Sequence, residues 1–288
     1  MHIPIVSKPT SANKVTIETI NFLASTYQAN KYLEIGVKAG GVFFHIDMER
    51  KVGVDPVFQF EECVFSDERR VFFRELSDAF FERLKRDSAV LPVAFHDLGG
   101  KPTFDIIFID GMHTFEQCFR DFQNSLAFAH DSTIWVLDDT VPSDPFSSLP
   151  NYEFSIACRQ AAGIADKPWH GDVFKIVFAI HDFYPDFSYC TRMAGNPQTV
   201  VWRATNGKRK QLFTSIEQIS CLDYFKMLEY APLLMPVNDD IFRYFIGMSI
   251  DPIKYGTKNT WKKLIYRCCI TENEKKYNKL LKDLSINK

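Results

Sequence analysis

The sequence has no long apolar run. No stretch reaches the roughly 18 consecutive apolar residues that a membrane-spanning helix needs. The first residues, Met1 to Ile5, also lack the charged segment and the apolar stretch of a secretory signal. We therefore exclude a membrane-spanning helix and expect a cytoplasmic protein.

Paired cysteines and phosphate-binding loops are missing as well. The seven cysteines are odd in number and never form C-x-x-C, so neither a disulfide framework nor a zinc cluster is indicated. The chain contains neither G-x-G-x-x-G nor a G-x-x-x-x-G-K-[ST] loop. Their absence disfavours a classical dinucleotide-binding or ATP-binding protein.

What the chain does contain is typical of a globular protein. Hydrophobic residues make up 46% and charged residues 24%, and the 27 phenylalanines can fill a large aromatic core. The net charge of −2 is unevenly distributed, because residues 254–288 hold ten Lys or Arg against three Asp or Glu. The acidic remainder argues against a nucleic-acid partner. The basic tail is expected either to be a solvated helix face or to contact an anionic membrane or glycan.

Helical and strand-like patterns alternate along the first 205 residues. Periodic segments predict helices at 15–27, 67–86 and 114–129. Short apolar runs predict strands at 32–37, 51–56, 91–98, 104–110, 133–137, 173–180 and 199–203. This alternation predicts an α/β fold, a three-layer sandwich around a mostly parallel sheet. We expect one domain over residues 1–205 and a helical, basic appendage over residues 206–288.

Ligands of open α/β sheets bind at the carboxyl ends of the strands. The first predicted strand ends in a turn, Glu34 to Gly41, whose glycines would let a ligand approach the backbone. Asp55 ends the second strand, where a carboxylate can accept hydrogen bonds from both hydroxyls of a ribose. The alternative is a simple tight turn with no ligand.

A second polar cluster follows two later strands. Asp110 and His113 come after one strand, and Asp138 and Asp139 after the next. Adjacent strands lie about 5 Å apart, so these side chains are expected to converge. Clustered carboxylates repel one another unless they are protonated or bridged by a cation, and oxygen ligands suit Mg²⁺. The alternatives are that the two aspartates cap the following loop and that His113 makes a structural hydrogen bond.

These motifs resemble the class I S-adenosylmethionine (SAM)-dependent methyltransferases over residues 12–205. The matching stretches are Y-L-E-I-G-V-x-x-G-G, K-V-G-V-D-P, S-D-A-F-F, F-D-I-I-F-I-D-G-M-H-T-F-E and G-D-V-F-K. The resemblance implies a Rossmann-like, seven-stranded sheet that binds SAM. It assigns the methionine end of SAM to Glu34, Gly36 and Gly40, the ribose to Asp55, and the adenine to His96 and Asp97. Asp110 is assigned to the cofactor site too.

A narrower resemblance concerns the acidic cluster. Asp110 and Asp138 are 28 residues apart, and an acid follows directly, as in metal-dependent O-methyltransferases of the catechol and macrolide-sugar types. It implies Mg²⁺ on Asp110, Asp138 and Asp139, with His113 as the base and Asp110 and Asp139 completing the catalytic set. The expected reaction is methyl transfer to a hydroxyl of a sugar or glycan. Alternatives are metal-independent transfer to oxygen or nitrogen of a small molecule, through His113 or Asp139, and a non-catalytic SAM-binding scaffold.

Overall fold

The computed structural model describes residues 13–164, 168–204 and 209–250. The chain divides into two compact units. Unit 1 comprises residues up to Gly111 together with residues 120–133, and unit 2 comprises residues 112–119 together with residues from Ile134 onward. Among the described residues, no helix combines the length and the apolar character needed to cross a membrane.

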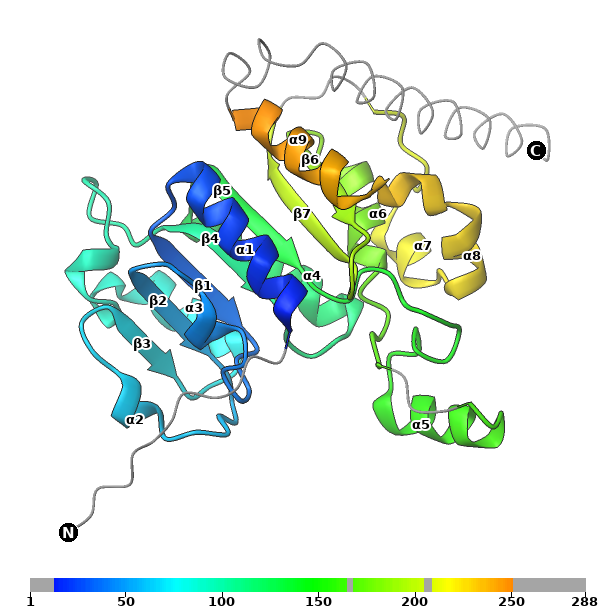
Figure 1. Ribbon diagram of the computed structural model, residues 1–288, viewed down its shortest axis with the longest axis horizontal. Coiled ribbons are helices and arrows are strands. Elements are labelled where there is room, and N and C mark those ends of the chain that lie inside the picture. Colours follow the sequence, from blue (N-terminus) through cyan, green and yellow to red (C-terminus); the bar gives the residue numbers. More distant parts are fainter. Residues whose placement is uncertain (1–12, 165–167, 205–208, 251–288) are drawn as a thin grey trace. The chain divides into compact units, whose positions relative to one another are not determined.

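The strands follow the order β3-β2-β1-β4-β5-β7-β6-β8 (Figure 1). The predicted α/β class with a mostly parallel sheet is confirmed, although the sheet has eight strands instead of seven. The additional strand, β8 (Pro236–Val237), is short and pairs in parallel with β6 (Phe187–Arg192). β5 (Ala129–Leu137) contributes residues to both units.

Unit 1 is a parallel β/α arrangement. β1 pairs with both β2 and β4, and β2 pairs with β3, all in parallel, so the strands end at a common carboxyl edge. Its elements are α1 (Lys14–Tyr27), β1 (Lys31–Ile35), η1 (Phe43–His45), β2 (Arg50–Val54), α2 (Glu62–Phe65), β3 (Arg70–Phe73), α3 (Ser77–Arg86), η2 (Ser88–Val90), η3 (Val93–Phe95), β4 (Phe104–Ile109), the second part of α4 (Phe115–Ser125), η4 (Leu126–Phe128) and the start of β5.

The core of unit 1 explains these elements. β1 is buried along its whole length, its charged residue types Lys31 and Glu34 included, as expected of a strand covered on both faces. α1 begins where the side chain of Asn13 accepts a hydrogen bond from the Thr16 amide, and it ends at Gln28, which has a left-handed backbone. Phe80 and Phe81 of α3 are fully buried.

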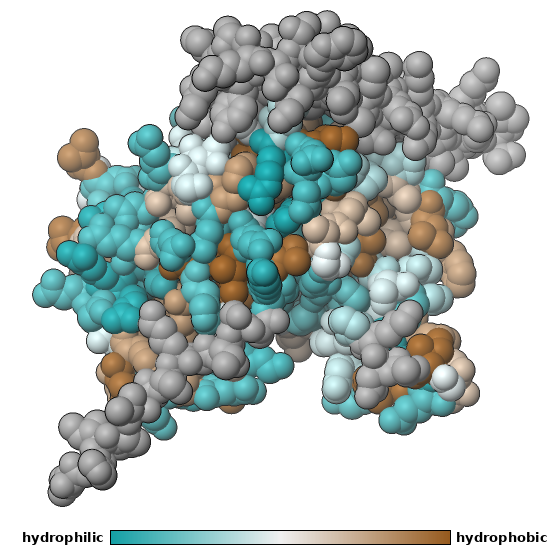
Figure 2. Space-filling view, viewed as in Figure 1, coloured by the Kyte–Doolittle hydropathy of each residue, from teal (hydrophilic) through white to brown (hydrophobic). Residues whose placement is uncertain are grey.

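Unit 2 carries the antiparallel part of the sheet. β7 (Gln198–Arg203) runs antiparallel to both β5 and β6, so the hairpin formed by β6 and β7 extends the sheet beyond β5. Its helical elements are the start of α4, α5 (Tyr152–Ala161), α6 (Lys175–Phe183), α7 (Ile216–Ser220), α8 (Tyr224–Glu229), η5 (Ala231–Leu234) and α9 (Asp239–Ile250). Figure 2 shows mostly hydrophilic residues on the face in view, with apolar side chains exposed over α5.

Three predicted elements are wrong. The segment 67–86 is not one helix, because it begins with β3 and becomes helical only at Ser77. The segment 91–98 is not a strand: beyond Pro92 the amides of Phe95 and His96 bond three residues back, as in a 3₁₀ turn. The segment 173–180 belongs mostly to α6, a helix that is buried nearly all round. A short apolar run of this kind cannot be distinguished from a strand by periodicity.

The predicted appendage is described only up to residue 250. Within residues 209–250 the chain is largely helical, in α7, α8 and α9, yet it also supplies β8 to the sheet. The basic tail, residues 254–288, lies outside the described residues. The domain boundary at residue 205 stays a prediction.

Candidate active site

The turn after β1 in unit 1 is built on left-handed backbone. Gly36, Lys38 and Gly40 have φ values of +91°, +49° and +74°. A Cβ atom on Gly36 would lie 1.9 Å from the backbone oxygen of Asp110, so only glycine permits this contact between the ends of β1 and β4. The Gly36 amide also donates to the Val54 oxygen at 2.9 Å. The turn therefore contacts the ends of β1, β2 and β4 at the carboxyl edge.

Asp55 holds this turn from the end of β2. Its carboxylate accepts hydrogen bonds from the amides of Lys38 and Val57, each at 2.7 Å, and the residue is buried. Each oxygen of a carboxylate has two acceptor positions, so these bonds still allow a further donor such as a ribose hydroxyl. Asp55 thus stabilises the turn, as the alternative of a tight turn without a ligand requires. It can also still accept a hydrogen bond from a ligand.

Glu34 lies buried beside the turn. The Tyr32 hydroxyl donates to its Oε2 at 2.7 Å. Burial raises the pKa of Glu34 to about 8, while the hydrogen bond from Tyr32 and the charge of Lys51 act in the opposite direction. At neutral pH the side chain is therefore mostly an uncharged acid.

The predicted adenine contacts do not lie at this edge. Lys31, the first residue of β1, donates to Asp97 at 2.6 Å, so Asp97 sits at the amino end of the strand. The His96 Nε2 lies 3.0 Å from the backbone oxygen of Ser88. The structure places His96 and Asp97 away from this edge, which speaks against the assignment of the adenine to them. The end of β3 at Phe73 and the residues that follow it, 74–76, were not recognised from the sequence, because the pattern placed them inside a helix.

Two strained residues meet in unit 2. His113 and Asp139 both have left-handed backbones, with φ values of +52° and +58°, although neither is glycine. The Nδ1 atom of His113 forms a close ion-pair contact with the Asp139 carboxylate. Such conformations cost about 1–3 kcal/mol each and cluster at functional sites. The structure therefore brings together two of the three predicted catalytic residues in a His–Asp pair.

Amide side chains hold the two aspartates that follow β5. The Nδ2 of Asn196 donates to Oδ1 of Asp138 at 2.9 Å and to Oδ1 of Asp139 at 2.8 Å. Asp138 Oδ1 also accepts from the Gln198 side chain at 3.1 Å and from the Asp139 amide at 3.0 Å. Burial and the neighbouring charge of Asp139 raise the pKa of Asp138 to about 7. The hydrogen bond from the Asp139 amide to Asp138 is a local contact of an aspartate with the backbone that follows it, as the structural alternative for these aspartates predicted.

Trp169 and Gly171 pack against His113. The indole of Trp169 stacks on the His113 ring, with centroids 5.1 Å apart and an interplanar angle of 21°. Its Nε1 donates to the Leu149 oxygen at 2.7 Å. A Cβ atom on Gly171 would lie 1.6 Å from the His113 backbone oxygen, so the G-D-V-F-K motif begins with glycine because the two backbones touch.

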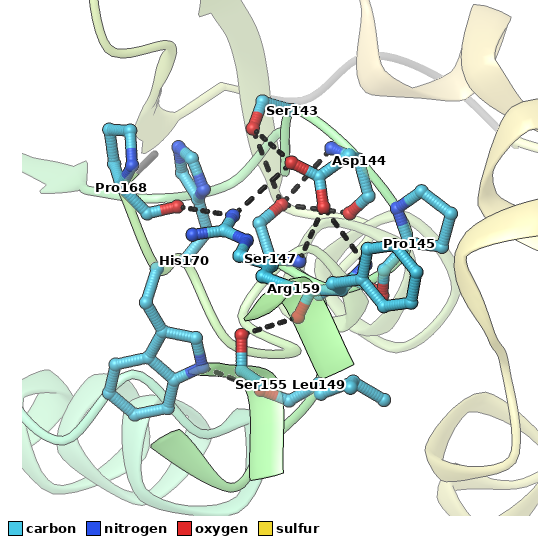
Figure 3. Close-up of polar contacts among 12 residues, drawn as sticks. Ser143, Asp144, Pro145, Ser147, Leu149, Ser155, Arg159, Pro168 and His170 are labelled. Atoms are coloured by element: carbon cyan, nitrogen blue, oxygen red, sulfur yellow. Dashed lines mark hydrogen bonds and ion pairs between the residues drawn. The ribbon is translucent and has the colours of Figure 1, made fainter. Parts of the chain in front are cut away.

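A buried arginine, Arg159, connects Asp144 with Pro168 through hydrogen bonds (Figure 3). Arg159 of α5 is 2% exposed, and its guanidinium donates to Asp144 at 3.2 Å and to the Pro168 oxygen at 2.9 Å. The Ser147 oxygen accepts from the amides of His170 and Gly171. Trp169, His170, Asn196 and Arg159 were all missed by the sequence analysis, because no motif marks them.

The parallel β/α strands and the glycine turn define a Rossmann-like domain. Residues 23–140 match the family model described as a methyltransferase domain. This segment of the chain is similar to that family, and the predicted resemblance to the methyltransferase superfamily is confirmed. No protein with a curated description matches the sequence significantly.

Several solved structures resemble the backbone at low identity. An O-methyltransferase from Bacillus cereus, solved with S-adenosylhomocysteine (SAH), is 14% identical with a TM-score of 0.44; the match covers 67% of this chain and 83% of that one. A putative caffeoyl-CoA O-methyltransferase from Staphylococcus aureus is 11% identical with a TM-score of 0.45, covering 67% and 85%. A putative O-methyltransferase from Klebsiella pneumoniae is 16% identical with a TM-score of 0.43, covering 67% and 81%.

Proposed function

We propose that this protein transfers the methyl group of SAM to a hydroxyl group, with His113 as the base. The observation that carries the proposal is the strained His113–Asp139 pair in a chain whose residues 23–140 form a methyltransferase domain. Asp110 connects the two features, because its backbone contacts Gly36 and it precedes His113 by only three residues.

Residues of unit 1 supply the donor site. Gly36 and Gly40 expose backbone at the strand ends, where the methionine part of SAM would lie. Asp55 would accept hydrogen bonds from the ribose hydroxyls while it keeps its bonds to the turn. Glu34, uncharged at neutral pH, would accept a hydrogen bond from the amino group of SAM without presenting a full charge. The adenine would lie toward the end of β3 instead of at His96 and Asp97.

The contact with Asp139 determines what His113 can do. A carboxylate against Nδ1 places the ring proton on that atom, so Nε2 carries the lone pair. His113 would take the acceptor's proton there as the hydroxyl oxygen attacks the methyl carbon. The carbon–oxygen bond forms while the carbon–sulfur bond breaks, and SAH leaves with the bond's electron pair. Asp139 stabilises the resulting imidazolium, and positioning contributes much of the rate.

A divalent cation remains part of this proposal. Asp138 fits less well as a ligand, because its Oδ1 already accepts three N–H groups inside the protein. Asp110 and Asp139 remain the proposed carboxylate ligands. When bound, Mg²⁺ would stabilise negative charge on the acceptor oxygen. In the metal-independent alternative, the His113–Asp139 pair acts alone.

For the acceptor, we favour a sugar or glycan over other small molecules. Trp169 stacks on His113, and the half-exposed Tyr152 packs edge to face with Trp169, with centroids 5.4 Å apart. Aromatic side chains present flat apolar faces of the kind that sugar rings cover. This aromatic pair supports a cyclic acceptor and leaves the individual compound open.

Calorimetric titration with SAH tests the donor site. Binding should be in the micromolar range for the wild type and for His113→Ala, and it should be lost in Asp55→Ala. His113→Ala should retain SAH binding but lose turnover on a panel of sugar and phenolic acceptors. No SAH binding by the wild type would overturn the proposal in favour of a scaffold, and unchanged turnover in His113→Ala would remove the base.

A further inference from the structure

The amide side chain of Asn196 forms hydrogen bonds with both Asp138 and Asp139. Asn196 lies between β6 and β7, and its Nδ2 donates to Asp138 and Asp139 at 2.9 and 2.8 Å. Its Oδ1 lies 3.1 Å from the Nε2 of His170. The chemistry fixes which end of the amide faces which partner, because only the nitrogen can donate to two carboxylates.

His170 fixes the other end of this amide. The residue is 3% exposed, and its own backbone amide donates to the Ser147 oxygen at 3.0 Å. Since Asn196 Oδ1 is an acceptor, Nε2 of His170 must carry the proton. The Nδ1 atom is buried, and it has no hydrogen-bond partner among the residues that the structure describes. Only one ring nitrogen of His170 therefore contributes to the arrangement.

Asp139 is thereby held at both oxygens. Oδ1 accepts from Asn196, and Oδ2 contacts Nδ1 of His113. Asp138 follows the same strand and would repel Asp139 if both were charged, yet Asn196 donates to both carboxylates at once. The Gln198 side chain also donates to Asp138, at 3.1 Å.

We propose that Asn196 and His170 are positioning residues for the proposed base. His170 orients the Asn196 amide, Asn196 orients Asp139, and Asp139 keeps His113 in the tautomer protonated on Nδ1. The proposal extends the His113–Asp139 pair to four residues drawn from four separate segments of unit 2. The expected effect on kcat rests on the proposed function, whereas the expected effect on the His113 tautomer does not.

The kinetic test compares matched variants. Asn196→Leu removes both hydrogen bonds to the carboxylates at similar volume. Gln198→Met is the control, because it removes a hydrogen bond to Asp138 and leaves the Asn196 amide in place. We expect Asn196→Leu to lower kcat by about tenfold to a hundredfold, since small misplacements of reacting groups have effects of that size. The KM for SAM and the affinity for SAH should not change. Gln198→Met should keep kcat within about threefold of the wild type.

Two substitutions of His170 test which ring nitrogen matters for activity. In His170→Gln the amide nitrogen takes the place of Nε2 and can still donate to Asn196. In His170→Asn the amide occupies the place of the unpartnered Nδ1 instead. We expect His170→Gln to retain most of the activity and His170→Asn to fall as Asn196→Leu does. Equal losses in the two variants would show that His170 serves packing alone.

The structural test needs no substrate. Nitrogen-15 NMR of ring-labelled protein in alkaline buffer reports the tautomer of each neutral histidine, and His113→Ala assigns the signal. The His113 signal should show Nδ1 protonated in the wild type, His170→Gln and Gln198→Met. It should revert toward the Nε2-protonated form in Asn196→Leu and His170→Asn. An unchanged tautomer in Asn196→Leu would overturn the proposal. A changed tautomer together with a wild type that methylates no acceptor would sustain the proposal and refute the proposed function.

Discussion

Replacing Glu34 by glutamine should make the folded protein less sensitive to alkaline pH. Glu34 is 2% exposed, and the Tyr32 hydroxyl donates to its Oε2 at 2.7 Å. Burial raises its pKa from 4.5 to about 8. Glutamine has the same shape and offers an oxygen to the same hydroxyl, but it cannot ionise. The substitution therefore removes the titration and keeps the contact.

The sign follows from where the proton is bound. Between about pH 4.5 and pH 8 the folded protein holds a proton on Glu34 that the unfolded chain has released. The stability contributed by this group is complete below about pH 4.5 and is lost as the pH rises to about 8. At about 1.4 kcal/mol per pKa unit, the whole effect amounts to at most about 5 kcal/mol.

Urea unfolding followed by circular dichroism measures this effect. Wild type and Glu34→Gln should have similar free energies of unfolding at about pH 5, and the variant should be several kcal/mol more stable at about pH 9. Glu153→Gln, in the exposed first turn of α5, controls for the loss of an acid elsewhere. A difference between Glu34→Gln and wild type that does not change with pH would refute the reasoning.

Three further predictions concern the turn, the buried arginine and the metal. Gly36→Ala should destabilise the protein by at least about 2 kcal/mol and abolish SAH binding, because Cβ would meet the Asp110 oxygen at 1.9 Å and φ is positive; a thermal midpoint equal to that of wild type would contradict this. Arg159→Met should cost about 3 kcal/mol in urea unfolding, since it leaves the Asp144 carboxylate without its buried partner, and a cost below about 0.5 kcal/mol would show that the pair contributes little. Exhaustive EDTA treatment should abolish turnover, added Mg²⁺ should restore it, and SAH affinity should persist; full activity without metal would favour the metal-independent alternative.

Local pattern was sufficient for much of unit 1. The local pattern predicted β1, β2 and β4 to within two residues at each end, and Gly36 and Asp55 were identified by their position after strands. The pattern failed at 91–98 and 173–180, where short apolar runs fit a strand and a buried helix equally well. The assignment of His96 and Asp97 to the adenine depended on the first of these predicted strands.

The sequence by itself determined the α/β class, the glycine turn and the identity of the residues that end each strand. These features depend on neighbours within a few positions along the chain, which set backbone conformation and burial. Tertiary structure decided the rest of the site. Asp139 meets His113 and Asn196, and His113 meets Trp169, only because the folded backbone of unit 2 brings distant segments together. The raised pKa of Glu34 is likewise a consequence of burial, and no stretch of sequence encodes burial locally.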